Sequence, residues 1–465
     1  MPSSVRLRLR FLSPLLLVLT QTLTAQQPIV RDSLGQRLDS LLRAAEARGF
    51  HGSVLVARRG EVVLLNGYGF ANHATNTRFS PSTLVQIGSN TKDFTATAIY
   101  QLIERGRLRL SDSLPRFFEG VPADKRGITV QQLLDHTAGL PLGLGGDERP
   151  LTKAQMLQEL WALTLPSPPG AGKRYSNLGY SILAAIIEQL SGMPFDAYVA
   201  QRIFDPAGMR ETGLLLPHFD RARIAHGYAE GRDRGVILDL PHDADGHSWN
   251  LRGNGGHLST VSDMHRFYRA LRGPALLRDE QHRRAVIPFN EPGVWAGSDM
   301  TSFFLFANFP GAEIEVLVAS NHREYQGNRL LREIEPILGL ELPGREVVPT
   351  TSAPLLDRVP DTGIGRTVAA YLEAFNTGDT ATMRRFFTER ALSGPDSPPL
   401  DVRLQRYQMM WSDVGRLTVR GVRQVPDGAG LIVVAARDNG ETLTLTFNVE
   451  PEPPHRLRSI RVEIG

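Results

Sequence analysis

Cysteine is absent from this sequence of 465 residues. The chain can therefore form no disulfide, and it has no thiol nucleophile, no thiolate metal ligand and no cysteine for a lipid anchor. It also has little net charge. The formal charge is +3, and Arg6, Arg8 and Arg10 account for all of it, because the first 25 residues contain no acidic residue. This balance gives no reason to expect nucleic acid or an anionic membrane as a partner.

Long apolar runs are also scarce, and the clearest one lies near the N-terminus. Residues 11–19 are mostly leucine, follow the three arginines and precede Ala25, a small residue suited to cleavage. This pattern predicts an export signal over residues 1–25, because the run is too short to span a membrane comfortably. We therefore expect a secreted or periplasmic protein with no membrane span once the signal is removed.

The candidate nucleophile is Ser89, in a segment (86–94) that reads Gln-Ile-Gly-Ser-Asn-Thr-Lys-Asp-Phe. Apolar residues recur after it with helical spacing, so Ser89 is expected at the start of a helix. Residues three apart share a helix face, which places the amine of Lys92 beside the Ser89 hydroxyl. Such a lysine can take the serine proton, and the N–H groups at a helix start can stabilise an oxyanion. The alternative is an incidental Ser-x-x-Lys pair.

A second polar cluster is Tyr175-Ser176-Asn177, which precedes an apolar helix predicted over 178–190. On an extended loop, residues two apart point the same way, so Tyr175 and Asn177 are predicted to share a direction. Tyr175 can exchange a proton with Ser89 if an ammonium such as Lys92 lowers its pKa. Asn177 can donate to a substrate carbonyl. The alternative is that both residues only cap and anchor the helix.

Elements at both ends of the first 340 residues predict a layered α+β domain. A helix over 34–45 precedes a hairpin of strands at 52–57 and 61–66, and a second hairpin pairs 301–308 with 313–319. A short helix is expected over 328–335, where Pro336 should end or kink it. We predict an antiparallel sheet flanked by helices, with the middle of the chain as a helical lobe.

These motifs resemble those of the serine β-lactamase and penicillin-binding-protein superfamily. Ser89-Asn90-Thr91-Lys92 resembles its first motif, and Tyr175-Ser176-Asn177 resembles the Tyr-x-Asn motif of the class C-like, esterase branch. Supporting segments lie at 67–72, 133–140, 204–209 and 255–260. The resemblance covers roughly residues 30–340 and implies a β-lactamase/DD-peptidase-like fold.

The third motif departs from the family pattern. The family usually has Lys-Thr-Gly or His-x-Gly on the strand that faces the nucleophile, and the best match here is Trp295-Ala296-Gly297-Ser298. Tryptophan offers an apolar face and one N–H in place of a cation. The change favours neutral esters or amides over carboxylate substrates, unless Arg323 or Arg252 replaces the cation. The alternative for Trp295 is a surface or interface aromatic.

The resemblance implies an acyl-enzyme mechanism. Ser89 attacks a carbonyl, Lys92 and Tyr175 move the proton with the choice of base left open, and Asn177, Trp295 and Gly297 lie beside the substrate. The N–H groups of Ser89 and Ser298 form the oxyanion hole. No metal or cofactor is expected, because segment 242–247 contains only part of a calcium loop and is interpreted as solvated.

The predicted function is therefore an exported serine hydrolase for small ester, amide or peptide substrates. A carboxylesterase is favoured over a β-lactamase or a D-alanyl peptidase. The alternative is a catalytically idle member of the fold that binds cell-wall peptide or a protein partner.

The last quarter of the chain predicts a separate domain. Residues 343–361 are rich in proline and predict a linker. An apolar stripe over 368–375 then predicts a helix, and alternating apolar residues at 443–449 and 460–464 predict strands. This order resembles the nuclear-transport-factor-like (SnoaL-like) α+β cone, a module that often forms a pocket or a homodimer. Substrate gating, dimerisation and tethering are therefore all open as its role. The predicted organisation is a signal peptide (1–25), a hydrolase domain (26–342), the linker (343–361) and the cone domain (362–465).

Overall fold

A computed structural model describes most of the chain. The described residues are 26–147, 149–214, 219–229, 232–239, 242–243, 246–298, 301–322, 327–340, 356–392, 399–424, 430–437 and 442–464. The predicted export signal lies outside them, as does most of the predicted linker.

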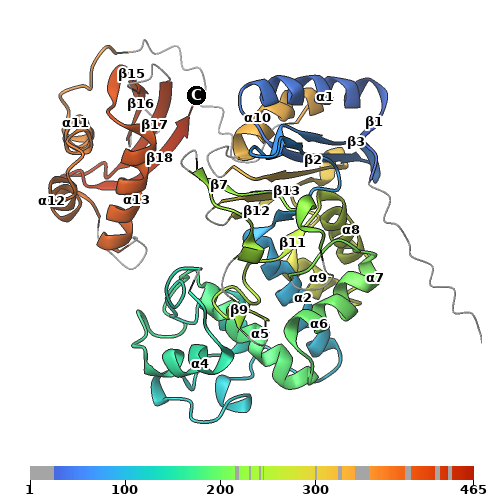
Figure 1. The fold of residues 1–465 in the computed structure, drawn as a ribbon. Helices are drawn as coiled ribbons and strands as arrows, with labels where there is room; N and C mark the ends of the chain where they lie inside the picture. The colour runs from blue at the N-terminus through green and yellow to red at the C-terminus, as the bar shows by residue number, and fades with distance from the viewer. Residues whose placement is uncertain are drawn as a thin grey trace, which may run out of the picture. The chain divides into compact units, whose positions relative to one another are not determined.

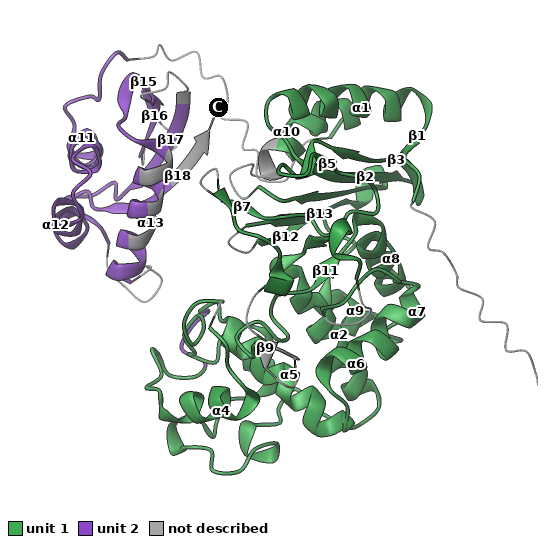
Figure 2. Ribbon diagram, viewed as in Figure 1, with its two compact units in different colours: residues 1–169, 174–342 green, residues 170–173, 343–465 purple. Residues whose placement is uncertain are grey.

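The chain divides into two compact units (Figure 2). One contains residues 1–169 and 174–342, and the other contains residues 343–465 and 170–173. The predicted domain boundaries stay a prediction, because residues 341–355 are not described.

The first unit is built on a six-stranded antiparallel sheet with the order β1-β3-β2-β14-β13-β12 (Figure 1). Its strands are β1 (Ile29–Val30), β2 (Gly52–Arg58), β3 (Glu61–Tyr68), β12 (Gly293–Ser298), β13 (Phe303–Phe309) and β14 (Ile314–Ser320). The two predicted hairpins are confirmed, and they lie side by side, with Val54 opposite Val318. The predicted α+β fold class is confirmed as well.

Apolar side chains cover both faces of this sheet. Along β2, Val54 and Val56 belong to one buried layer and Leu55 and Ala57 to the other. Helices α1 (Asp32–Ala47) and α10 (Gly327–Leu338) cover the first layer, and α2 (Thr91–Glu104) and α8 (Val261–Arg272) pack on the second (Figure 1). A strand buried on both faces has a continuous apolar sequence rather than an alternating one.

Helix α10 continues through Pro336 to Leu338, so the proline does not end the helix, while the predicted alternative of a kink at Pro336 stays a prediction. Proline removes one backbone N–H, but here it falls in the last turn, where few helical hydrogen bonds remain to be lost. Ile337 and Leu338 pack against the same apolar layer as α1. These contacts keep the last turn helical.

The other helices of this unit form the predicted helical lobe on the second face. They are α3 (Val130–Leu134), α4 (Lys153–Ala162), α5 (Asn177–Ser191), α6 (Phe195–Val199), α7 (Asp205–Ala207) and α9 (Glu280–Val286). Helix α5 packs against α2 and α3. Within the described part of the chain, no helix combines the length and the apolar character needed to cross a bilayer.

The second unit consists of three helices followed by a four-stranded antiparallel sheet in sequential order. Its elements are α11 (Gly363–Asn376), α12 (Thr380–Arg390), α13 (Leu400–Val414), β15 (Thr418–Gln424), β16 (Gly430–Ala436), β17 (Thr442–Val449) and β18 (Leu457–Ile464). The predicted first helix and last strands are confirmed. Gly378 turns the chain at φ 69°, and Asp379 then caps α12 through the backbone N–H groups of Ala381 and Thr382.

The edge strand β12 lies against a 3-10 helix, η1 (Gly88–Asn90), which leads into α2. The contact is between backbones. A Cβ atom added to Gly297 would lie 2.3 Å from the carbonyl oxygen of Ile87 and 2.6 Å from the nitrogen of Ser89. One added to Gly88 would lie 2.7 Å from the nitrogen of Ser298, and Gly88 also has φ +50°. Glycine at both positions therefore lets the strand approach Ser89.

We predict that Gly297→Ala destabilises the first unit by about 1–3 kcal/mol, because the added methyl group has no room and β12 must move away from η1. Urea unfolding measures this change. The matched control is Gly311→Ala, since Gly311 is exposed and no atom lies within 4 Å of its added Cβ. Equal stability of the two variants would mean that β12 does not approach Ser89 this closely.

Candidate active site

Ser89 lies in η1 and receives two side-chain hydrogen bonds. The Lys92 Nζ atom donates to its Oγ atom at 3.1 Å, and the Tyr175 hydroxyl donates at 2.9 Å. Lys92 is in the first turn of α2, and Tyr175 is 86 residues from Ser89 in the chain. The structure thus brings the three predicted catalytic residues together. Ser89 and Lys92 meet because of helix geometry, and Tyr175 reaches Ser89 because α5, which follows it, packs on α2.

Lys92 is buried, and this changes its chemistry. Its side chain is 6% exposed and also donates to the carbonyl oxygen of Asn254 at 2.8 Å. Its Nζ atom lies 5.0 Å from the ring centroid of Tyr175 and 5.6 Å from that of Tyr180. Burial lowers the pKa of Lys92 to about 7, although the charges of Asp93 and Asp147 oppose this. The amine can therefore be neutral at physiological pH.

The pKa of Asp93, the residue next to Lys92, is shifted in the opposite direction. Burial raises the pKa of its carboxyl group to about 7, while a hydrogen bond from the Tyr268 hydroxyl at 3.0 Å and the charge of Lys92 oppose the rise. Tyr268 also accepts a hydrogen bond from the Asn90 side chain at 3.1 Å. The helix start beneath Ser89 thus holds a buried acid beside a buried base.

The pKa of the Tyr175 hydroxyl differs from the one that the sequence-based hypothesis needs. Partial burial raises its pKa above the usual value, and the hydrogen bond with Ser89 does not reverse the rise. The hypothesis needed a Tyr175 pKa lowered by an ammonium. It fails because burial of the hydroxyl outweighs the other contributions and because Lys92 itself is readily neutral.

The turn before α5 is positioned by Ser176 and His136. Ser176 is the N-cap of α5, where its hydroxyl accepts from the Gly179 N–H at 3.1 Å and donates to the carbonyl oxygen of Pro141 at 2.6 Å. The Nδ1 atom of His136 accepts from the Ser176 N–H, and its ring lies 4.4 Å from that of Tyr175. Asn177 is therefore the first residue of the helix and not part of an extended loop. The residue that caps the helix is therefore Ser176, and the alternative in which Asn177 is the cap is wrong.

A cavity of about 270 Å³ opens beside Ser89. Its walls include the predicted residues Ser89, Asn177 and Ser298. In the described part of the chain, the Oδ1 atom of Asn177 is buried without a hydrogen-bond partner. This oxygen can only accept a hydrogen bond, so the expected donation from the Asn177 side-chain NH2 group to a substrate carbonyl stays a prediction.

Trp295 and Gly297 lie on the opposite face of β12 from Ser298, because side chains alternate along a strand. The Trp295 ring stacks on Phe306 at 5.7 Å and covers Gly293. Trp295 is not among the described residues that line the cavity. A substrate contact for Trp295 therefore stays a prediction, while Gly297 acts through the close approach of β12 to Ser89.

Sequence reasoning missed several cavity residues. Asp147, Asn254 and segment 234–237, which begins with Arg234, also line the cavity. They come from loops between short elements and form no motif, so only their spatial position reveals them.

Of the two proposed replacement cations, Arg252 is buried 3.3 Å from Asp196, and Arg323 is outside the described residues.

The chain matches the family model "Beta-lactamase" over residues 38–313. Two proteins of Bacillus subtilis are similar to it. The putative penicillin-binding protein PbpX is 29% identical over 283 residues, which are 61% of this chain and 67% of PbpX. Penicillin-binding protein 4* is 32% identical over 242 residues, which are 49% of this chain and 53% of that protein. The match to penicillin-binding protein 4* thus spans about half the length of that relative.

Solved structures support the same fold. FmtA from Staphylococcus aureus superposes with a TM-score of 0.58 at 17% identity, covering 68% of this chain and 92% of FmtA. D-Amino acid amidase from Ochrobactrum anthropi superposes with a TM-score of 0.56 at 21% identity, and the match covers 66% of this chain and 99% of the amidase. The octameric penicillin-binding protein homologue from Pyrococcus abyssi gives 0.55 at 19% identity and covers 92% of this chain and 98% of that one.

The family match covers more than half of the chain, and the sheet, helices and Ser89 site lie within or next to it. The chain therefore belongs to the beta-lactamase family, a family of serine hydrolases.

Proposed function

We propose that this protein hydrolyses esters or amides through an acyl-enzyme on Ser89. The observation that carries the proposal is the convergence of Lys92 and Tyr175 on the Ser89 Oγ atom at the edge of a cavity. A serine hydroxyl is a weak nucleophile until a neighbouring base takes its proton, and both neighbours are within hydrogen-bond distance.

Lys92 is the proposed base. Its neutral Nζ atom takes the Ser89 proton while the Oγ atom forms a bond to the substrate carbonyl carbon. The backbone N–H groups of Ser89 and Ser298 stabilise the oxyanion, supported by the close approach of β12 to η1. The Lys92 proton then passes through the Tyr175 hydroxyl to the leaving group as the bond to it breaks. Water attacks the acyl-enzyme in a second, similar step and releases Ser89.

Neutral esters are the proposed preferred substrates, since tryptophan stands where the family usually has a cation. A second candidate is an amide or peptide with a free carboxylate, as in a D-alanyl peptidase or a β-lactamase. The observation that favours it is the position of Arg234 in the cavity wall. A guanidinium is well suited to bind a carboxylate.

Two further proposals concern the rest of the chain. We propose export through residues 1–25, as their arginines and apolar run suggest. We also propose that the C-terminal unit is a SnoaL-like cone that mediates homodimer formation. Three helices before a four-stranded antiparallel sheet support this assignment.

We predict that Ser89→Ala abolishes both ester hydrolysis and covalent labelling, because the Ser89 Oγ atom is the one on which Lys92 and Tyr175 converge. Intact mass after exposure to p-nitrophenyl butyrate, a fluorophosphonate and a penicillin measures this. The control is Ser40→Ala, an exposed serine on α1 that should leave the reactions unchanged.

Turnover of the ester and labelling by the fluorophosphonate, without a penicilloyl adduct, would support an esterase. A penicilloyl adduct on Ser89 would favour the second candidate. No adduct or turnover with any probe in the folded wild-type protein would contradict the hydrolase proposal and favour a binding role.

We further predict that kcat/KM for the ester rises with pH through a midpoint near 7. Below this pH Lys92 is protonated and cannot accept the serine proton, and above it the amine is neutral. Asp93 titrates in the same range, so the variant Asp93→Asn identifies the group. The negative charge of Asp93 raises the Lys92 pKa, and its removal should therefore move the midpoint to lower pH. Loss of the pH dependence in this variant would instead assign it to Asp93.

Arg234→Gln separates the two substrate classes. If carboxylate substrates bind at Arg234, the variant should raise their KM by about tenfold or more, because a charge-assisted hydrogen bond is lost. The KM of neutral esters should stay unchanged. Steady-state kinetics with an ester and a matched ester that bears a carboxylate measures the difference. Equal effects on both would exclude Arg234 as a carboxylate-binding residue.

A further inference from the structure

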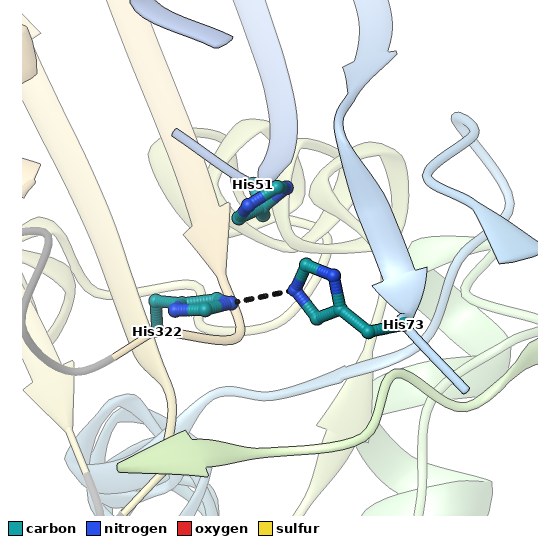
Figure 3. A group of neighbouring side chains, drawn as sticks. All are labelled: His51, His73 and His322. Atoms are coloured by element: carbon teal, nitrogen blue, oxygen red, sulfur yellow. Dashed lines mark hydrogen bonds between the residues drawn. The ribbon is translucent and has the colours of Figure 1, made fainter. Parts of the chain in front are cut away.

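Three histidines meet at one end of the main sheet (Figure 3). His51 directly precedes β2, and His322 lies two residues after the end of β14. These strands are paired, with Gly52 opposite Ser320, so the two histidines emerge side by side. His73 follows β4 (Phe70–Asn72), which continues from the end of β3. None of the three is among the described residues that line the Ser89 cavity.

The ring nitrogens are grouped as metal ligands are. One nitrogen from each histidine lies within 4.8 Å of the other two. The Nε2 atoms of His73 and His322 are 3.3 Å apart. In a tetrahedral site with Zn–N bonds of about 2.0–2.1 Å, two ligand nitrogens are about 3.4 Å apart. This pair is thus already at the required spacing, and His51 needs a small adjustment.

Neighbouring groups hold the rings. The Tyr228 ring stacks on His322 at 4.9 Å and 17°, and it meets His73 edge-on at 4.7 Å. The Tyr228 hydroxyl also accepts the His73 backbone N–H at 2.9 Å. His51 and His322 are partly buried, while His73 is exposed and leaves a path for an ion from solvent.

Imidazole nitrogens are common protein ligands for divalent zinc, nickel and copper. Three of them converge here from three separate segments of the chain, so the cluster fits such an ion.

We propose that His51, His73 and His322 form a binding site for one divalent transition-metal ion, such as Zn²⁺. The proton arrangement changes on binding. The His51 Nδ1 atom accepts the Phe70 backbone N–H at 2.9 Å, so the proton of this neutral ring is on Nε2. For Nε2 to bind the ion, that proton moves to Nδ1 and the Phe70 hydrogen bond is lost. The ring that donates in the His73–His322 contact shifts its proton in the same way.

The site would also affect the wall of the Ser89 cavity. Tyr228 begins β7 (Tyr228–Ala229), which pairs with β8 (Arg232–Asp233), and segment 234–237 follows directly in the cavity wall. An ion that fixes His322 also fixes the ring stacked on it. An ion that binds these histidines only in the folded protein stabilises the folded form, so we expect bound metal to raise the melting temperature of the first unit.

The test uses the full chain without a polyhistidine tag, treated with EDTA and dialysed. Zn²⁺ affinity is measured by competition with a chromogenic chelator, and Co²⁺ provides a visible spectrum that reports its ligand geometry. We expect one ion per chain, a tetrahedral Co²⁺ spectrum and a higher melting temperature with Zn²⁺. Absence of stoichiometric Zn²⁺ binding at micromolar concentrations would overturn the proposal.

Variants locate the site. His73→Gln and His322→Gln should each weaken Zn²⁺ binding by at least about tenfold, the loss known for altered outer-shell partners of a metal. His73 is exposed, so its variant should fold, and circular dichroism checks this. The control is His282→Gln, which changes a histidine that contacts Glu104 elsewhere in the same unit. Unchanged affinity in a folded His73→Gln protein, or an equal loss in the control, would place the ion elsewhere.

Discussion

The burial of the Lys92 amine is the constraint on which the Ser89 site depends. Helix α2 directs the side chain inwards, and the carbonyl oxygen of Asn254 and the rings of Tyr175 and Tyr180 enclose it. An ammonium is costly in such surroundings, so the neutral amine becomes accessible near pH 7. The α2–α5 packing, the loop at Asn254 and the cap at Ser176 all contribute to this enclosure.

The second requirement is the close approach of β12 to η1. A sheet edge brought against a helix start places two backbone segments, at Ser89 and Ser298, next to each other. Gly88 and Gly297 make this possible because neither has a side chain. The hydrophobic layers on both faces of the sheet hold β12 in position, so the geometry at Ser89 depends on the core of the whole first unit.

The loop segment 226–239 links two parts of the molecule that the sequence does not relate. Through Tyr228 it contacts two of the three histidines, His73 and His322, and its later residues line the cavity beside Ser89. Asn321 strengthens this link, because its side-chain amide donates to the carbonyl oxygens of Phe70, Ala71 and His226. The end of the sheet and the cavity wall are thus joined by a short segment that hydrogen bonds hold at Asn321.

The sequence by itself determined the α+β class, both hairpins of the main sheet and the proximity of Ser89 and Lys92, because these follow from local periodicity and helix spacing. It also indicated Tyr175 through a motif. Only the tertiary structure decided that Lys92 has the lowered pKa and Tyr175 the raised one, since burial depends on neighbours from distant segments. The inward stacking of Trp295, the position of Arg234 in the cavity wall and the meeting of three histidines likewise depend on packing, which no spacing along the chain encodes.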